Sequence, residues 1–137
     1  MKEQQHFSKL YHCVFALHYH LVIVTKYRRK CITAPMLDSL RITAAARCEG
    51  WGGKLVELNG DADHVHMLVN LPPNLDLSGF VNNLKTTTSR LLRQDFPQLR
   101  RVYRKPVLWS RSYCIISCGG APLSIIQQYI EQQASPD

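Results

Sequence analysis

Hydrophobic and polar positions follow two different periods along the chain, and the changes between them predict strands and helices. Residues 18–27, HYHLVIVTKY, are β-branched and aromatic, which predicts a first strand. Pro35 begins a stretch with apolar side chains at helical spacing as far as Cys48. The glycines at 50–53 end this helix.

The next segment predicts two short strands. They cover residues 54–59 and 64–71, and a turn begins between them at Gly60-Asp61. Pro72-Pro73 ends the second strand, because proline cannot donate a hydrogen bond to a neighbouring strand.

Residues 75–94 carry the clearest helical pattern. One stripe is largely apolar and consists of Leu77, Phe80, Val81, Leu84, Thr88, Leu91 and Leu92. A basic connector at 97–106 and a strand at 107–117 follow.

Gly119-Gly120 breaks that strand, and a last helix is predicted after it. Ser124 and Gln127 have the spacing of a capping box, which marks a helix N-terminus. The chain therefore predicts an α+β fold. We expect a ferredoxin-like sandwich with an antiparallel sheet, helices on one face and an additional C-terminal helix. No repeat or linker is visible, so residues 1–137 are expected to form a single domain.

Composition and charge narrow the functional classes. A hydrophobic content of 45% with seven Gly and seven Pro describes a globular chain. The net charge of +7 favours a polyanionic partner, with nucleic acid first and an anionic membrane surface second. The segment 1–9 is polar, and the longest apolar run is Leu21–Val24. We therefore expect a soluble, cytoplasmic protein without a signal peptide or a membrane span.

The five cysteines do not suggest a site. Their number is odd and no CxxC pair occurs, which argues against a disulfide framework and a thiolate zinc site. Buried, reduced thiols are the expected state.

His64 and His66 form the first candidate metal pair. Side chains alternate along a strand, so both imidazoles project from one face while Val65 and Met67 project from the other. Two adjacent imidazoles can hold a divalent ion, although ordinary histidines near a strand end give the same pattern. Leu68 occupies the place where histidine-triad hydrolases carry a third histidine.

A second His-x-His sequence, His18 and His20, is the rival metal pair. It lies before the apolar centre of the first strand and has no obvious third ligand, so a structural or DNA-facing role is the alternative.

Tyr129 and Gln133 are four residues apart in the predicted last helix and therefore share a face. Ile126 and Ile130 border this face, so it should pack against the rest of the protein. A core tyrosine with its hydroxyl at the surface would satisfy the same pattern.

Taken together, five segments resemble the single-tyrosine HUH transposases of the insertion-sequence 200/605 family. They are YHLVIVTKYRRK at 19–30, HVH at 64–66, RLLRQDF at 90–96, LWSRSYCIISCGGAPL at 108–123 and QQYIEQQ at 127–133. The resemblance extends over nearly the whole chain in matching order and spacing.

This resemblance implies a role for each candidate residue. His64 and His66 would be the metal pair, Gln133 the third metal ligand and Tyr129 the nucleophile. It also implies a homodimer that cleaves and rejoins single-stranded DNA at element ends, recognised as hairpins. The tyrosine helix of one subunit commonly completes the partner's active site in this family, and Gly119-Gly120 would allow such a swivel.

The chemistry is consistent with these residue types. Imidazole ligands suit Mn²⁺ and oxygen ligands suit Mg²⁺, so either ion is expected as the cofactor. Attack by Tyr129 would give a 5′-phosphotyrosine link and a free 3′-hydroxyl, which supports strand transfer without ATP. No P-loop sequence is present.

Basic residues on several elements are candidates for gripping DNA. They lie at the ends of predicted strands and helices or on the polar face of the helix 75–94. The residues predicted to bind DNA are Arg28, Arg29, Lys30, Lys85, Arg90, Arg93, Arg104 and Lys105. Solvated surface charge is the alternative for each of them.

Two other functions remain open at this level. One is a related HUH nuclease that acts on a host's repeated hairpins. The other is a non-catalytic, ferredoxin-like nucleic-acid-binding protein, which would not need Tyr129 and Gln133 beside a histidine pair.

Overall fold

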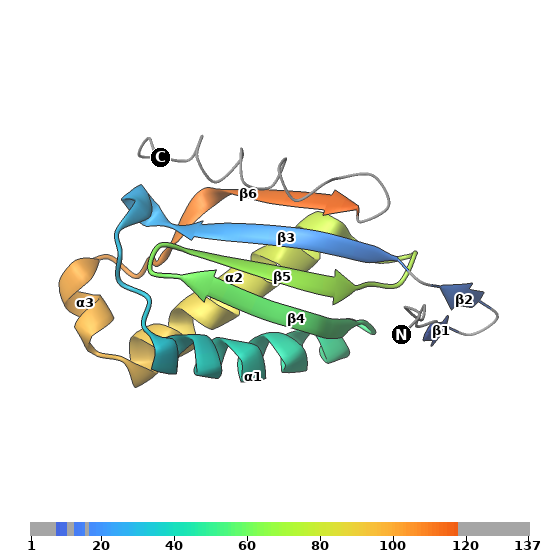
Figure 1. Ribbon diagram of the computed structural model, residues 1–137, viewed down its shortest axis with the longest axis horizontal. Helices are drawn as coiled ribbons and strands as arrows, with labels where there is room; N and C mark the ends of the chain where they lie inside the picture. The colour runs from blue at the N-terminus through green and yellow to red at the C-terminus, as the bar shows by residue number, and fades with distance from the viewer. Residues whose placement is uncertain (1–7, 11–12, 16, 118–137) are drawn as a thin grey trace, which may run out of the picture.

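A computed structural model describes residues 8–10, 13–15 and 17–117, and its centre is a four-stranded antiparallel sheet (Figure 1). The strands are β3 (His18–Thr25), β4 (Lys54–Asp61), β5 (His64–Asn70) and β6 (Trp109–Ser117). Their order across the sheet is β4-β5-β3-β6, with β3 and β5 in the middle. This order confirms the predicted ferredoxin-like α+β fold.

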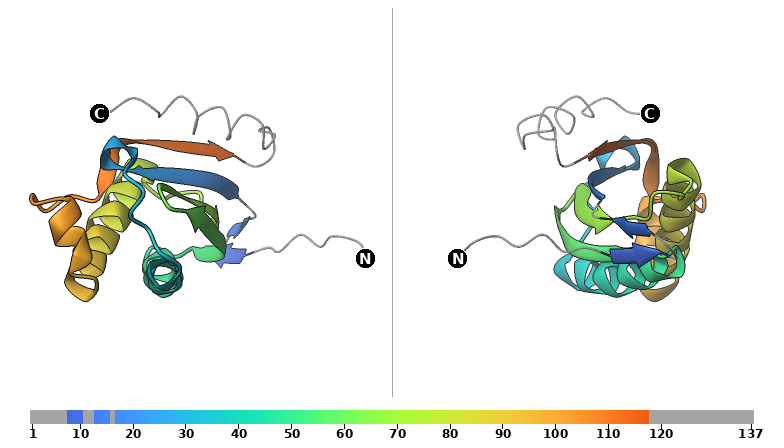
Figure 2. Two further views of the ribbon diagram at one scale, coloured as in Figure 1. Left: turned by 60° about the vertical axis from the view of Figure 1, so that its left-hand side comes forward. Right: turned by 90° about the vertical axis from the view of Figure 1, so that its right-hand side faces the viewer.

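Two long helices cover one face of this sheet (Figure 2). Helix α1 (Ala34–Gly50) connects β3 to β4, and helix α2 (Leu77–Asp95) leads from β5 towards β6. Side chains cap both N-termini: Thr33 accepts from the Met36 N–H at 3.4 Å, and Asp76 accepts from the Gly79 N–H at 3.2 Å. Such caps satisfy backbone donors that have no partner within the helix.

The main core lies between the helices and this face of the sheet. In β5 the strictly alternating residues Val65, Met67 and Val69 are at most 1% exposed, as the strand pattern predicted. Five of the seven predicted stripe residues of α2 are fully packed, and Leu77 and Leu91 are half-buried. The sequence pattern therefore identified the buried faces correctly.

The opposite face of the sheet has a small apolar cluster of its own. Val22 and Val24 of β3 are buried, and Cys114 and Ile116 of β6 pack against them. This cluster lies beside the histidines of β5, because Val22 pairs with His66 and Val24 with His64.

Two predictions about the connections were wrong, and a third connection contains a helix that was not predicted. Gly60 and Asp61 belong to β4, so the turn to β5 is formed by Ala62 and Asp63. The first strand stops at Thr25, and Lys26–Arg28 form a 3-10 turn, η1. The basic connector contains a short helix, α3 (Gln98–Val102).

A short hairpin precedes the sheet and was not predicted. Its strands, β1 (Ser8–Leu10) and β2 (Cys13–Phe15), pair with each other in a separate two-stranded sheet. Three-residue strands are too short for the alternation that reveals longer strands.

Three described cysteines are free thiols, and both tryptophans pack in or against the core. Cys31, Cys48 and Cys114 are free thiols, and burial raises the pKa of Cys48 to about 12. Trp109 is buried in the core, and Trp51 contacts Phe80 edge-on, with 6.0 Å between ring centroids.

Two further expectations concern the C-terminal helix and a membrane span. The predicted C-terminal helix lies outside the described residues. Within the part of the chain that the structure describes, no helix is long and apolar enough to cross a bilayer.

Candidate active site

Strand β5 presents His64 and His66 on the sheet face that points away from the helices. The intervening Val65 is fully buried in the main core, which fixes the orientation of both histidines. Their rings are stacked, with centroids 6.3 Å apart and an interplanar angle of 23°. The sequence prediction that the two imidazoles share one face is confirmed.

The neighbouring strands supply the surroundings of the pair. In the row of His66, Asn59 of β4 stands on one side and Val22 of β3 on the other. Asp61 and Val24 flank His64 in the same way. The histidines therefore lie between a polar edge and a small apolar cluster.

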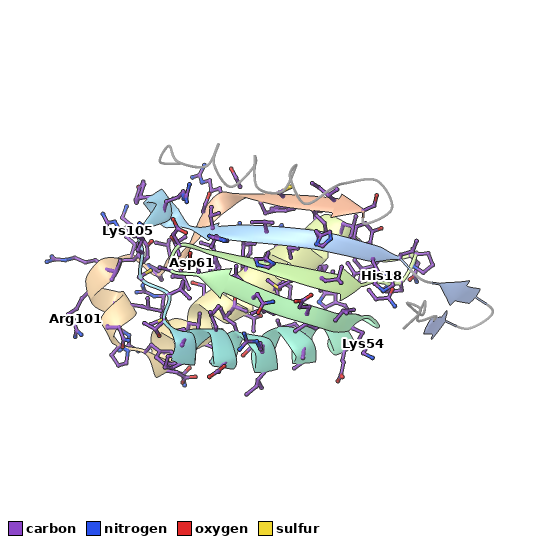
Figure 3. The ribbon with its side chains drawn as sticks, in the orientation of Figure 1. His18, Lys54, Asp61, Arg101 and Lys105 are labelled. Carbon is purple, nitrogen blue, oxygen red and sulfur yellow. The ribbon has the colours of Figure 1, made fainter. Side chains whose placement is uncertain are left out.

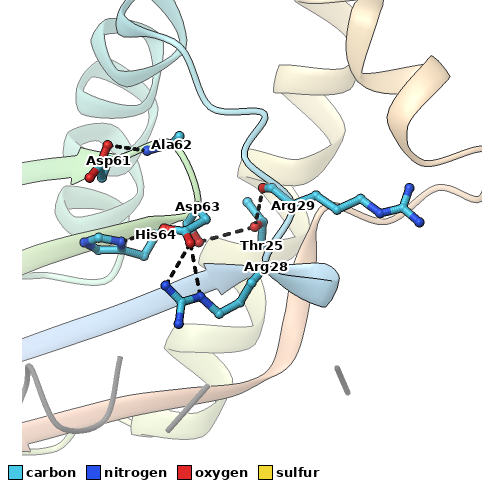
Figure 4. A network of polar contacts seen from close by, with 7 residues as sticks. All are labelled: Thr25, Arg28, Arg29, Asp61, Ala62, Asp63 and His64. Atoms are coloured by element: carbon cyan, nitrogen blue, oxygen red, sulfur yellow. Dashed lines mark hydrogen bonds and ion pairs between the residues drawn. The ribbon is translucent and has the colours of Figure 1, made fainter. Parts of the chain in front are cut away.

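The carboxylate of Asp63, which also binds Arg28, contacts the ring of His64 (Figure 4). The Nδ1 atom of His64 lies 3.0 Å from Oδ1 of Asp63. Both Nε and a terminal nitrogen of Arg28 donate to Oδ2 of the same carboxylate, at 3.1 and 2.8 Å. The Asp63 side chain is only 9% exposed, so this network is well shielded from solvent.

The electrostatics favour a charged Asp63 and a neutral His66. Burial alone would raise the pKa of Asp63, but hydrogen bonds from His64 and Arg28 outweigh it and hold the pKa below its usual range. Burial lowers the pKa of His66, and electrostatic repulsion between its protonated form and the nearby His64 ring lowers it further. A neutral imidazole is the form that can bind a metal.

The donor set fits a divalent ion that needs further ligands. With Nδ1 of His64 occupied by Asp63, its Nε2 is the nitrogen available for coordination. Among the described residues, no group of three His, Cys, Asp or Glu side chains could hold a metal. His64 and His66 could therefore supply part of a coordination shell, to be completed by another group such as the amide of Gln133.

The rival pair, His18 and His20, is differently placed. His18 pairs with Asn70 at the far end of β5 from His64 (Figure 3). His20 stands opposite Leu68, close enough to influence the pKa of His66. The described structure thus brings only His20 near the pair of β5.

Tyr129 and Gln133, the predicted nucleophile and third ligand, lie outside the described residues. Their roles remain predictions.

Several of the predicted DNA-binding residues gather at the His64 end of the sheet. The exit of β3 and the end of α3 meet there, since Arg29 donates to the carbonyl of Val102 at 2.7 Å. Figure 3 shows Lys105 and Arg101 at this end. Lys30 and Arg104 are exposed as well, and Lys30 precedes Cys31, whose N–H donates to the carbonyl of Ala62. Arg28, by contrast, is half-buried and bound to Asp63.

The basic residues of α2 lie along a cleft between this helix and the start of β6. The cleft has a volume of about 460 Å³, and Arg90 is exposed at its margin. Two predicted DNA-binding residues also fix the protein's own backbone here. Lys85 donates to the carbonyls of Ser110 and Arg111, and Arg93 donates to those of Tyr103 and Val107. These four contacts measure 2.6, 3.0, 2.8 and 3.2 Å, respectively.

Sequence reasoning missed Asp63 as a partner of His64. A carboxylate immediately before the His-x-His sequence was a signal in itself. Its partner Arg28 comes from a segment 35 residues earlier, which no local pattern could reveal.

The fold and the site define a basic, ferredoxin-like α+β protein with paired histidines on the sheet face opposite helices α1 and α2. Residues 13–133 match the family described as "Transposase IS200 like", and the chain belongs to this family. It is therefore a transposase, an enzyme that cleaves and rejoins DNA.

Two curated relatives are transposases of insertion sequences. The transposase for insertion sequence element IS200 from Salmonella typhimurium is 31% identical over 130 residues, which cover 95% of this chain and 85% of the relative. The ISDra2 transposase TnpA from Deinococcus radiodurans is 31% identical over 120 residues, covering 88% and 86%.

Solved structures agree on the fold. A Deinococcus radiodurans R1 protein assigned as a transposase has a TM-score of 0.83 and 32% identity, with 93% of this chain and 98% of that chain covered. A REP-associated tyrosine transposase bound to a REP hairpin has a TM-score of 0.52 and 11% identity, covering 93% and 67%. At that identity the second structure shows a shared fold only.

Proposed function

We propose that this transposase cleaves and rejoins single-stranded DNA at the ends of an insertion sequence through a covalent link to Tyr129. The observation that carries the proposal is the histidine pair of β5. His64 and His66 stack on the sheet face opposite helices α1 and α2, in a chain of the IS200-like family.

In this proposal the metal ion is bound by three side chains of the protein. His64 and His66, with Gln133, would hold a divalent ion, Mg²⁺ or Mn²⁺. When bound, such an ion supplies Lewis-acid polarisation of a phosphate oxygen. Asp63 keeps His64 in place.

Tyr129 would attack the scissile phosphorus. A bond forms between its phenolic oxygen and phosphorus while the bond from phosphorus to the 3′-oxygen breaks. The phenol loses its proton and the 3′-oxygen gains one. The phosphodiester is conserved as a 5′-phosphotyrosine, so a second 3′-hydroxyl can reverse the step and join new ends.

The charge distribution supports a nucleic-acid substrate. Lys105 lies at the end of the sheet where His64 begins β5 (Figure 3). The exposed Lys30 precedes Cys31, whose N–H donates to the carbonyl of Ala62 at the same end. Phosphate contacts by such residues position a strand without reading its sequence. We propose that hairpins formed by the element's ends are bound here by a homodimer, whose subunits share active sites.

A domesticated nuclease that acts on host repeats would use the same residues. The relatives that are more than 30% identical favour the ends of an insertion sequence as the substrate. The REP-associated structure resembles this chain only in fold.

Metal-dependent cleavage by histidine variants tests this proposal. Single-stranded hairpin oligonucleotides from the element's ends are incubated with wild-type protein or His64→Ala, with Mg²⁺, Mn²⁺ or EDTA. We expect cleavage by the wild type with either metal and none with EDTA. His64→Ala should lose cleavage while still binding DNA.

The matched control is His18→Ala, a histidine at the other end of the same sheet. It should cleave normally. Full cleavage by His64→Ala, with loss in His18→Ala, would move the metal site to the rival pair.

A further inference from the structure

Three backbone hydrogen bonds from the exit of β3 hold the two-residue turn between β4 and β5. The N–H groups of Cys31 and Ile32 donate to the carbonyl of Ala62, at 3.0 and 2.9 Å. The N–H of Thr25 donates to the carbonyl of Asp63 at 3.0 Å. The exit of β3 therefore holds the backbone from which the Asp63 side chain projects.

The same exit segment has an unusual backbone that presents Arg28. Tyr27 and Arg28 have φ angles of 60° and 52° and are the two described non-glycine residues with positive φ. This conformation disfavours L-residues and persists only where surrounding contacts hold it. Here the contacts include the two hydrogen bonds from Arg28 to Oδ2 of Asp63.

These contacts divide the carboxylate between two partners. Oδ2 accepts from the guanidinium, which leaves Oδ1 to face Nδ1 of His64 at 3.0 Å. A carboxylate paired with arginine can only accept, so Nδ1 must carry the proton of the neutral imidazole. The unprotonated nitrogen is then Nε2.

We propose that Asp63, clamped by Arg28, is the positioning residue of the metal site: it fixes His64 as the tautomer that presents a bare Nε2 to the ion. The inference rests on the proposed function, in which His64 is a metal ligand. A carboxylate behind a ligating imidazole fixes the ring and raises its basicity, and its loss typically weakens metal binding about 10–100-fold.

Asp63→Asn provides a sharp test because it preserves shape and changes the donors. The two N–H groups of Arg28 still require the remaining oxygen, so the new amide NH₂ faces Nδ1 of His64. Nδ1 must then accept, and the proton moves to Nε2. The substitution therefore inverts the tautomer.

The tautomer is measured first, without metal, by ¹⁵N NMR of the histidine rings in the full-length protein at about pH 8, where imidazole is neutral. We expect the Nδ1–H form for His64 in the wild type and the Nε2–H form in Asp63→Asn. An Nε2–H form in the wild type would overturn the inference, whether or not any variant folds.

Metal affinity is measured next by titration with Co²⁺ alone, followed by its absorption spectrum. Asp63→Asn should bind Co²⁺ about 10–100-fold more weakly than the wild type. Arg28→Lys keeps the charge but not the two-point contact with Asp63. Its Co²⁺ affinity should lie between those of the wild type and Asp63→Asn.

The matched control is Asp38→Asn. Asp38 is also paired with an arginine, Arg41, at 2.8 Å, but on the surface of α1. Its Co²⁺ affinity should equal that of the wild type.

His64→Ala separates the two claims. If it binds Co²⁺ as the wild type does, the histidine pair is not the metal site and the proposed function fails. If it loses Co²⁺ while Asp63→Asn retains full affinity, the metal site stands and the positioning role of Asp63 is wrong.

Discussion

At the scale of single residues, the site and the core depend on polar groups that have one specific partner. Asp63 accepts from Arg28 and His64 beside the metal pair. In the core, Nε1 of Trp109 donates to the hydroxyl of Thr88 at 2.9 Å, and both residues are buried. A buried donor that loses its acceptor costs more free energy than the hydrogen bond itself contributes.

The Trp109–Thr88 contact gives a prediction of stability. Thr88→Val keeps the volume but removes the acceptor of the Trp109 N–H. We expect the free energy of unfolding to fall by about 1–3 kcal/mol, measured by urea denaturation.

The double variant is the control for this prediction. In a Trp109→Phe background no donor is left without a partner, so Thr88→Val should cost clearly less. Equal costs in both backgrounds would show that the hydrogen bond is not the cause.

At the scale of elements, α2 both supports the sheet and faces a basic cleft. Lys85 fixes two carbonyls of β6, whereas Arg90, five residues later, is exposed at the margin of the cleft. One helix therefore carries basic residues in different surroundings, although the sequence pattern predicted the same role for both.

Substitutions of these two residues should have separate effects. Lys85→Met should lower the free energy of unfolding by about 1–2 kcal/mol, because it leaves backbone acceptors without their charged donor. Arg90→Ala should leave stability unchanged and weaken DNA binding, with a smaller salt dependence.

Urea denaturation and binding to single-stranded DNA at several salt concentrations measure both effects. An Arg90→Ala variant with an unchanged salt slope would mean that this part of α2 does not touch DNA.

At the scale of the whole molecule, the chain carries a net charge of +7, and its basic residues differ in their distance from the histidine pair. One end of the sheet combines His64 with exposed basic residues such as Lys105, whereas Lys54 lies at the opposite end (Figure 3). A DNA strand bound at the histidines would pass over the end of the sheet that carries Lys105.

Lys105 and Lys54 are therefore a matched pair for salt-dependent binding. Each phosphate contact to single-stranded DNA contributes about 0.7 to the slope of log K against log salt. We expect Lys105→Ala to reduce the slope by about this amount and Lys54→Ala to leave it unchanged. Equal slopes for the two variants would show that the basic end does not guide the DNA.

Much of the fold could be predicted because its strands and helices are long enough to show their periods. The alternation in β5 identified the face of His64 and His66, and the stripe of α2 identified its buried side. The connections were predicted less well. Left-handed backbone at Tyr27 and Arg28, and the pairing of Arg28 with Asp63, depend on contacts between segments far apart in the sequence.

Detection of the covalent adduct is the direct test of Tyr129 as the nucleophile. Hairpin oligonucleotides labelled at the 5′ or the 3′ end are incubated with the protein and Mg²⁺, then separated on a denaturing protein gel. We expect a Mg²⁺-dependent band that carries the fragment downstream of the cut, and its absence in Tyr129→Phe, which should still bind the DNA. A band that persists in Tyr129→Phe, or tight binding to the correct ends without an adduct in any metal, would contradict the assignment of Tyr129 as the nucleophile.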